Sequence, residues 1–121
     1  TSLRVLTVDD SATMRALLLH ALSAQGFEVA QADDGLTALD WLSVNEVDVV
    51  ITDINMPGLD GYGLIEQVRA GSRHRDRPIL VLSTESSDDK KERARAAGAT
   101  GWIVKPFDPD KLAAAVRRVA H

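Results

Sequence analysis

Short apolar stretches of this sequence are followed directly by side chains capable of ionic and hydrogen-bonding chemistry. Four such stretches end in the polar residues Asp9 and Asp10, Asp53, Ser83, and Lys105. Apolar runs of this length, rich in Val, Ile and Leu, are typical of parallel strands covered on both faces. Ligands bind such sheets beyond the carboxyl ends of the strands. We therefore expect three carboxylates, a hydroxyl and an ammonium to meet at one edge.

Three carboxylates at one edge repel one another, and their proximity raises the pKa of at least one of them. A divalent cation relieves this repulsion, and an all-oxygen set of ligands suits Mg²⁺. Lys105 supplies a counter-charge for the acids, either as a structural ion pair or as a cation for a transferring phosphoryl group. Ser83 has no base beside it, so it is interpreted as a hydrogen-bond partner rather than a nucleophile. Asp10 alone fits equally well as a cap for the helix beginning near Ser11.

Two periodicities alternate along the chain, and together they predict an α/β fold. Five apolar runs predict strands at residues 3–8, 27–30, 47–51, 79–82 and 102–104. Helical spacing of apolar residues predicts helices around 14–22, 34–44, 61–70, 86–97 and 112–119. Leu17 belongs to the apolar stripe of the first helix, and Leu36 marks the second. Right-handed crossovers then give a doubly wound (βα)5 sandwich, an open parallel sheet with helices on both faces.

The helix at 86–97 carries only Ala as apolar residues, so we expect it to be the most weakly docked of the five. Glycines stand where three helices should end, and they suit C-terminal caps: Gly26, Gly71 and Gly98. His20, His74 and His121 lack the spacing of metal ligands, and we expect all three at the surface or at a boundary. The run Arg73–Arg77 is interpreted as solvated charge.

Composition excludes several classes of protein. The 121 residues predict a single domain, residues 1–121, and a net charge of −4 disfavours nucleic acid as a generic partner. The absence of Cys excludes disulfides, thiolate catalysis and cysteine-ligated metals. No apolar run is long enough to span a membrane, and the hydrophobic fraction of 45% supports a folded core. These features predict a small, soluble, cytoplasmic domain without a membrane partner.

The sequence resembles the receiver domain of two-component response regulators, in particular the stand-alone chemotaxis members. The resemblance covers residues 3–120. It is carried by the segments Asp9–Arg15, Asp53, Asn55–Gly61, Ser83, Gly98-Ala99 and Gly101–Phe107, in order and at the expected strand ends. For the fold, the resemblance implies the strand order 2-1-3-4-5.

The resemblance also implies roles for individual residues. Asp53 is the phosphoacceptor, and Lys105 pairs with the phosphoryl group. The implied Mg²⁺ ligands are Asp10, Asp53 and the main-chain carbonyl of Asn55, with Asp9 acting through a metal-bound water. Ser83 moves to hydrogen-bond the phosphoryl group, and the aromatic switch residue is Trp102. Two positions depart from the family pattern: Trp102 replaces the more usual Tyr or Phe, and Thr84 replaces a small Ala, which we expect to narrow access to Asp53.

The implied protein is a monomeric signalling switch rather than a turnover enzyme. A sensor histidine kinase donates the phosphoryl group, and the surface built from the helix at 86–97, the Trp102 strand and the last helix binds a target. The chemotaxis likeness favours the flagellar motor switch as that target, with a separate phosphatase left open. Within the family, a phosphate sink, a relay intermediate and a receiver cut from a longer DNA-binding regulator remain alternatives. The ending at Val119–His121 favours a free-standing protein.

Two other classes fit the residues less well. An aspartate-nucleophile phosphatase needs a second Asp as general acid two positions after the first, and this position is Asn55. A flavodoxin-like cofactor binder needs a phosphate-binding loop after the first strand, where Asp9 and Asp10 have the wrong charge for a phosphate without metal.

Overall fold

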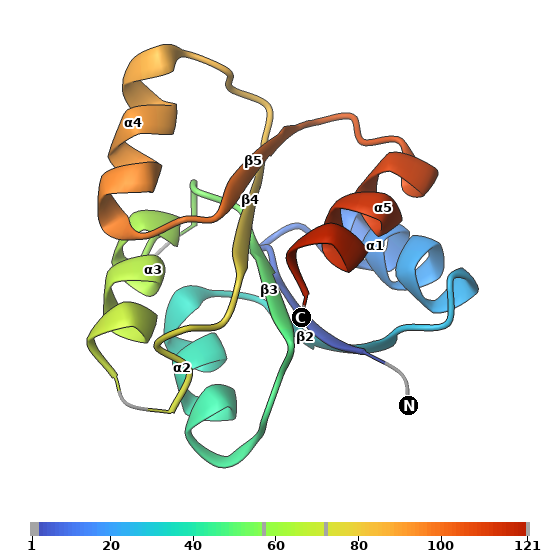
Figure 1. Cartoon of the computed structure of the whole chain (residues 1–121), viewed down its shortest axis with the longest axis horizontal. Coiled ribbons are helices and arrows are strands. Elements are labelled where there is room, and N and C mark those ends of the chain that lie inside the picture. The colour runs from blue at the N-terminus through green and yellow to red at the C-terminus, as the bar shows by residue number, and fades with distance from the viewer. Residues whose placement is uncertain (1–2, 57, 72, 121) are drawn as a thin grey trace.

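The computed structural model describes residues 3–56, 58–71 and 73–120, in which five strands alternate with five helices (Figure 1). The predicted α/β class is confirmed. In chain order the elements are β1 (Arg4–Val8), α1 (Ala12–Ala24), β2 (Glu28–Ala32), α2 (Gly35–Val44), β3 (Val49–Thr52), α3 (Gly61–Ala70), β4 (Ile79–Ser83), α4 (Asp88–Ala97), β5 (Gly101–Val104) and α5 (Pro109–Val119). No helix among the described residues is long and apolar enough to cross a membrane.

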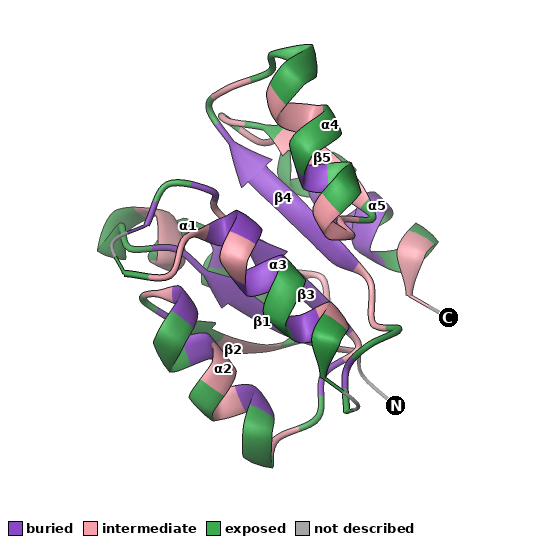
Figure 2. Cartoon of the chain, turned by 90° about the vertical axis from the view of Figure 1, so that its left-hand side faces the viewer, coloured by how far each residue is buried: buried purple, intermediate pink, exposed green. Residues whose placement is uncertain are grey.

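All neighbouring strands pair in parallel, and their order is β2-β1-β3-β4-β5, which confirms the expected topology. Helices α2, α3 and α4 cover one face of the sheet, and α1 and α5 cover the other (Figure 1). The central strands β1, β3 and β4 are almost wholly buried between these layers (Figure 2). Burial on both faces explains why their sequences are continuous apolar runs rather than alternating ones.

Polar side chains begin most of the helices at the edge of the sheet where the strands end. Ser11, Asp34, Asp60 and Asp108 are N-caps whose side chains accept hydrogen bonds from main-chain N–H groups of the first turn. The cap of α1 is therefore Ser11, and the side chain of Asp10 is left for another role. At the other end of α4, Gly98 adopts a φ of 118°, a left-handed conformation that suits glycine.

Helix α4 is thinly anchored, as its composition predicts. Its single buried residue is Ala94, and its N-cap Ser87 makes no side-chain capping hydrogen bond. The Arg93 guanidinium lies 4.0 Å from the centre of the Tyr62 ring on α3, and Arg69 donates hydrogen bonds to the carbonyl of Gly98. Helix α4 is therefore attached to the rest of the fold largely by polar contacts rather than by buried apolar side chains. We expect it to shift more easily than the other helices.

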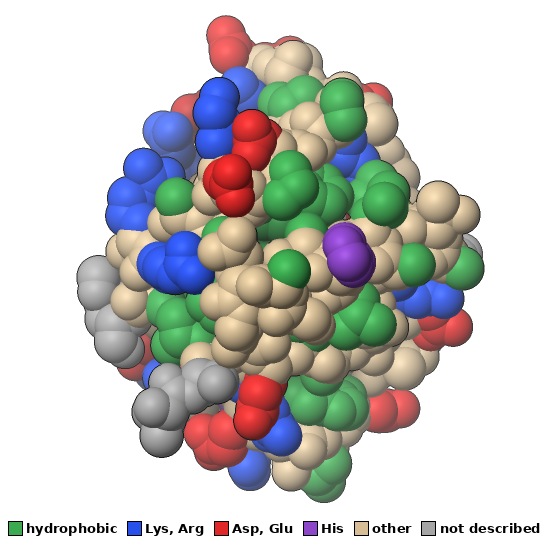
Figure 3. All heavy atoms as spheres, turned by 90° about the vertical axis from the view of Figure 1, so that its right-hand side faces the viewer, with side chains coloured by type: hydrophobic (Ala, Val, Ile, Leu, Met, Phe, Trp, Pro, Cys, Tyr) green, Lys and Arg blue, Asp and Glu red, His purple; other side chains and the backbone are tan. Residues whose placement is uncertain are grey.

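Two expectations about exposure were wrong. Leu17 is 51% exposed, because the apolar stripe of α1 is wider than the face that touches the sheet. Exposed apolar side chains are visible on the face of the molecule that carries α1 and α5 (Figure 3). His74 is buried, 5% exposed, although its neighbours in the sequence are charged. His20 is exposed as expected, and His121 lies outside the described residues.

His74 is buried because its imidazole ring forms hydrogen bonds with the C-terminal end of α2. Its Nε2 lies 3.1 Å from the carbonyl oxygen of Leu42 and 2.9 Å from that of Asn45. Since both partners are acceptors, Nε2 carries the proton and donates to them. The ring therefore satisfies carbonyls that the end of a helix leaves without partners.

Candidate functional site

Two adjacent strands carry the first two carboxylates to the same edge of the sheet. Asp9 follows β1 and Asp53 follows β3, and the Asp53 N–H donates to the carbonyl of Val8 across 2.9 Å. One carboxylate oxygen from each of Asp9, Asp10 and Asp53 lies within 4.8 Å of the others. The acids predicted from the ends of the apolar runs are therefore brought together.

Lys105 directly follows β5, which is separated from β3 by β4, and its side chain extends to this cluster. Its Nζ lies 3.0 Å from Oδ2 of Asp9 and 3.3 Å from Oδ2 of Asp53. The side chains of Lys105, Asp9 and Asp53 are only 12%, 2% and 12% exposed, so these ion pairs are shielded from water. The Lys105 N–H also donates to the Ser83 carbonyl, and the peptide bond to Pro106 is cis.

The electrostatics of Asp53 reflect competing influences. Burial raises the pKa of its carboxyl group above the ordinary value, and the Asp9 carboxylate adds to that rise, while Lys105 opposes it. Oδ1 of Asp53 also accepts a hydrogen bond of 2.7 Å from the Ile54 N–H. The resulting carboxylate is held in one orientation by a main-chain donor on one oxygen and by an ammonium on the other.

The cluster fits a divalent metal ion. Burial disfavours the charged form of Asp53, and Lys105 is a single cation facing the carboxylates of both Asp9 and Asp53. Further positive charge therefore stabilises the site. Asp10 is exposed, so this edge is accessible from solvent. An all-oxygen set with a small number of carboxylates is the environment that Mg²⁺ prefers, because this ion keeps several of its waters.

Ser83 and Trp102 are joined through the main chain of Glu85, which sequence reasoning did not identify. Ser83 is fully buried, and its Oγ accepts a hydrogen bond of 3.2 Å from the Glu85 N–H. The Trp102 indole N–H donates to the Glu85 carbonyl across 2.8 Å. The Glu85 side chain forms an ion pair with Lys90 at the start of α4. One residue thus connects the hydroxyl, the aromatic ring and the helix.

Two further residues form hydrogen bonds with the main chain next to the carboxylates. Arg15 on α1 donates from Nη1 to the Asp9 carbonyl at 2.7 Å. Gly61 begins α3, and its N–H donates to the carbonyl of Ile54 at 2.9 Å. A Cβ added to Gly61 would overlap the carbonyl oxygen of Asp53, so only glycine allows α3 to begin this close to the strand end.

Fold and site together define a receiver domain. A family model of the response regulator receiver domain matches residues 5–117, and the chain belongs to this family.

Individual relatives come from bacterial signalling systems. The chain is 38% identical to the chemotaxis protein CheY of Pseudomonas aeruginosa over 118 residues, which are 97% of this chain and 95% of the relative. It is 41% identical to CheY-3 of Vibrio cholerae over 107 residues, 88% of this chain and 82% of that one.

Solved structures agree with this family. The structure of CheY4 of Vibrio cholerae superimposes with a TM-score of 0.94 at 43% identity, covering 98% of this chain and 99% of CheY4. The receiver domain of a sensor histidine kinase from Pseudomonas aeruginosa, described with a magnesium ion coordinated in its active-site cleft, superimposes with a TM-score of 0.91 at 25% identity. It covers 98% of each chain.

Proposed function

We propose that this protein is a phosphorylation-activated response regulator that accepts a phosphoryl group on Asp53 from the phosphohistidine of a sensor kinase. The observation that carries the proposal is the position of the Asp53 carboxylate. It lies at the carboxyl edge of the sheet, close enough to Asp9 and Asp10 to share a metal ion and to Lys105 to form an ion pair.

The transfer requires an attack in line with the leaving group. An oxygen of Asp53 forms a bond to phosphorus while the bond from phosphorus to the histidine nitrogen breaks, and the imidazole leaves with the electron pair. The product is an acyl phosphate, which water later hydrolyses. Little covalent chemistry is asked of the protein, so positioning and charge stabilisation supply most of the rate.

Different residues of the site supply the positioning and the charge stabilisation. The Ile54 N–H fixes the orientation of the Asp53 carboxylate, and Lys105 presents an ammonium to the oxygens of the incoming group. Asp9, Asp10, Asp53 and the main-chain carbonyl of Asn55 would hold Mg²⁺, with Asp9 contributing through water. When bound, Mg²⁺ supplies the positive charge that the phosphoryl oxygens and the carboxylates together require.

Phosphorylation changes the conformation of the protein through the hydrogen bonds of Glu85. If Ser83 turns its hydroxyl toward the phosphoryl group, its hydrogen bond with the Glu85 N–H is lost, and the loop that holds Trp102 and Lys90 is released. Helix α4 is thinly anchored, so its position responds to this loop. The surface of α4, β5 and α5 then changes, and this surface binds the target.

The chemotaxis relatives support a role in a chemotaxis pathway, with the flagellar motor switch as target. We expect a monomeric cytoplasmic protein that assists its own phosphorylation and dephosphorylation without turning over a substrate. The same site serves a phosphate sink or a relay intermediate equally well, and binding to a motor switch protein separates these roles. Steady turnover of a phosphate monoester would instead favour a phosphatase.

Mass spectrometry after incubation with Mg²⁺ and acetyl phosphate tests the proposal. We expect the wild type to gain one phosphoryl group, and Asp53→Asn to gain none. Asp40→Asn, an exposed acid on α2, is the matched control and should be phosphorylated normally. Omission of Mg²⁺ should abolish the gain. Equal phosphorylation of Asp53→Asn and wild type would refute the assignment.

A further inference from the structure

Two buried side-chain polar atoms have no hydrogen-bond partner among the described residues, the Tyr62 hydroxyl and Nδ1 of His74. Buried polar groups in proteins are nearly always paired, so each exception calls for a physical explanation. The Tyr62 ring lies under the Arg93 guanidinium and borders a hollow that Asn55 and Glu85 also border, so it belongs to the surroundings of the site already described. The free nitrogen of His74 needs an explanation of its own.

The contacts of His74 fix its protonation. Nε2 carries a proton, because it lies within hydrogen-bond distance of two carbonyl oxygens, those of Leu42 and Asn45. A second proton, on Nδ1, would have no acceptor in the part of the chain that the structure describes, so the ring is neutral and Nδ1 keeps its lone pair. The residue is 5% exposed, and Nδ1 itself is closed to water. A hydrogen-bond donor that meets Nδ1 therefore displaces no water from it.

His74 borders a hollow of about 350 Å³ between the C-terminal halves of α2 and α3. The apolar residues that line it are Leu39 and Leu42 of α2 and Val68 of α3, and Leu42 and Val68 are each only 4% exposed. An apolar cavity of about 150 Å³ is enough for benzene, so this hollow has room for a molecule built on one ring. An apolar cleft with a small number of polar groups is the usual form of a small-molecule site.

The polar residues around the hollow favour a neutral ligand. Ser43 and Gln67 line it with exposed side chains, which can turn aside to let a molecule reach the ring of His74. Arg73 also lines it and repels a cationic ligand, while its own guanidinium already pairs with Glu46 at 3.3 Å. A carboxylate has no proton to donate to Nδ1. A neutral hydroxyl group satisfies both conditions, because it donates a hydrogen bond and carries no charge.

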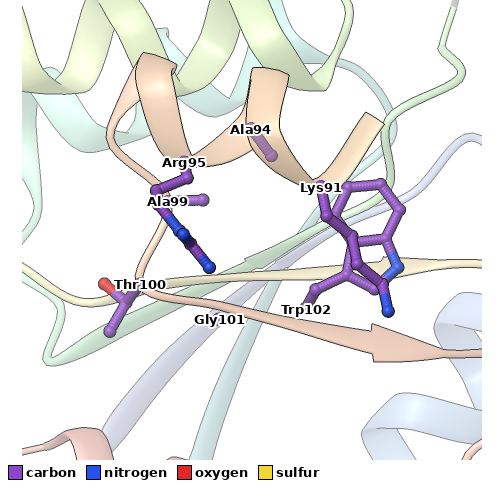
Figure 4. A pocket seen from close by; sticks show the side chains of 7 residues that line it. All are labelled: Lys91, Ala94, Arg95, Ala99, Thr100, Gly101 and Trp102. Carbon is purple, nitrogen blue, oxygen red and sulfur yellow. The ribbon is translucent and has the colours of Figure 1, made fainter. Parts of the chain in front are cut away.

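This hollow is separate from the phosphorylation site and from the surface of α4, β5 and α5. Helix α3 begins beside Asp53, whereas the hollow is bordered by the last turns of α3 and by its neighbour α2 (Figure 1). The hollow between α4 and β5, lined by Ala94 and Trp102, is smaller, about 110 Å³ (Figure 4). Within residues 3–56, 58–71 and 73–120, no buried polar side-chain atom that lacks a partner borders that second hollow.

We propose that the hollow between α2 and α3 binds a small neutral molecule with a hydroxyl group on an apolar ring. The hydroxyl donates a hydrogen bond to Nδ1 of His74, and the ring packs against Leu42 and Val68. Folding has already removed Nδ1 from water, so the new hydrogen bond adds to affinity without a further desolvation cost at this atom. The ring also removes apolar surface from water. The inference does not depend on phosphorylation of Asp53.

NMR titration of the full chain with p-cresol tests the proposal. The matched control is 4-methylanisole, in which a methyl group replaces the hydroxyl hydrogen of the same ring compound. With p-cresol, we expect the amide resonances of Ser43, Gln67 and His74 to shift, and the Nδ1 resonance of His74 to move to lower frequency as this nitrogen accepts a hydrogen bond. The affinity for 4-methylanisole should be about fivefold lower or less, the effect of losing one hydrogen bond.

Variants on α2 and at His74 locate the site. Ser43→Trp places a large side chain in the hollow and should abolish the shifts. Val44→Trp changes the next residue, which is 75% exposed and does not border the hollow, so this variant should bind p-cresol like the wild type. His74→Phe keeps a ring but lacks Nδ1, so p-cresol and 4-methylanisole should bind to it with similar affinity. Ser43→Trp and Val44→Trp retain His74, so their comparison holds even where His74→Phe does not fold.

Four outcomes overturn the proposal. They are the absence of shifts with p-cresol up to its solubility limit, equal affinity of the wild type for the two ring compounds, an Nδ1 resonance of His74 that stays unchanged at saturation, and equal loss of binding in Val44→Trp and Ser43→Trp. Mass spectrometry with acetyl phosphate reports phosphorylation of the same samples separately, and its result bears only on the proposed function.

Discussion

The ammonium of Lys105 lies 3.3 Å from Oδ2 of Asp53, although 52 residues separate them in the sequence. Both side chains are only 12% exposed, and Lys105 also contacts Asp9. The single cation therefore has two functions. It offsets the repulsion between two buried acids in the resting protein, and it is placed to meet a phosphoryl group on one of them.

Replacement of Lys105 by Met should destabilise the protein, because it leaves two shielded carboxylates without their counter-charge. We expect the free energy of unfolding without metal to fall by about 3 kcal/mol, the magnitude typical when one partner of a buried ion pair is removed. Mg²⁺ should restore part of this loss by neutralising the same carboxylates. Urea denaturation with and without Mg²⁺ measures both effects. Lys111→Met removes an exposed cation instead, and a comparable loss in that variant would contradict the explanation.

Asp53 should make stability depend on pH in a definite direction. Burial raises its pKa in the folded protein above the ordinary value of 3.8, so the folded state holds the proton more tightly than the unfolded state does. Its contribution to stability therefore falls as pH rises from 3.8 through the raised pKa. Without metal, Asp53→Asn should melt at a higher temperature than wild type at pH 7, and the difference should shrink toward pH 3.8. Thermal melts at several pH values would contradict this if the variant were less stable at neutral pH.

The hydrogen bond from Trp102 to Glu85 should hold the aromatic ring in the resting state. Trp102→Phe removes the indole donor, and the free energy of unfolding should fall by about 0.5–1.5 kcal/mol, typical of one hydrogen bond. In a Trp41→Phe background, the emission of Trp102 should change when acetyl phosphate and Mg²⁺ are added. Unchanged emission from protein that mass spectrometry shows to be phosphorylated would exclude Trp102 as a switch residue.

The site was predictable because its chemistry lies at strand ends. Continuous apolar runs locate the parallel strands, and the geometry of such a sheet brings Asp9, Asp53 and Lys105 to one edge whatever their separation in sequence. The role of Glu85 was not predictable in this way. It acts through its N–H and carbonyl, which every residue except proline possesses, and only the folded loop shows which main-chain groups face Ser83 and Trp102.

Exposure was less predictable than fold. Leu17 has the right spacing for the buried stripe of α1, but the pattern does not tell how wide a strip of the helix the sheet covers. His74 shows the opposite error. It lies among arginines, which favours exposure, yet its ring contacts carbonyls about 30 residues earlier in the chain. Local composition carries no information about such a distant partner.

His74→Leu should therefore destabilise the fold without affecting phosphorylation. The carbonyls of Leu42 and Asn45 lose their donor, and we expect the free energy of unfolding to fall by about 1–3 kcal/mol, the cost of leaving buried polar groups unsatisfied. Urea denaturation measures the loss, and mass spectrometry with acetyl phosphate measures the function. His20→Leu alters an exposed histidine on α1 and should leave stability nearly unchanged. Reduced phosphorylation of the folded His74→Leu protein would show a link to the site that the contacts do not contain.

Gly61→Ala should impair the site itself. The added Cβ overlaps the Asp53 carbonyl and lies close to Ile54, so the start of α3 or the end of β3 must move. We expect a loss of about 1–3 kcal/mol in stability, typical of overpacking, together with weaker Mg²⁺ binding and slower phosphorylation. Gly35→Ala is the matched control, because its Cβ meets the Leu59 carbonyl instead and should cost stability while sparing Mg²⁺ affinity. Mg²⁺ titrations followed by tryptophan emission compare the two. Equal weakening of Mg²⁺ binding in both variants would mean that general loosening of the fold, rather than the position of Asp53, accounts for the effect.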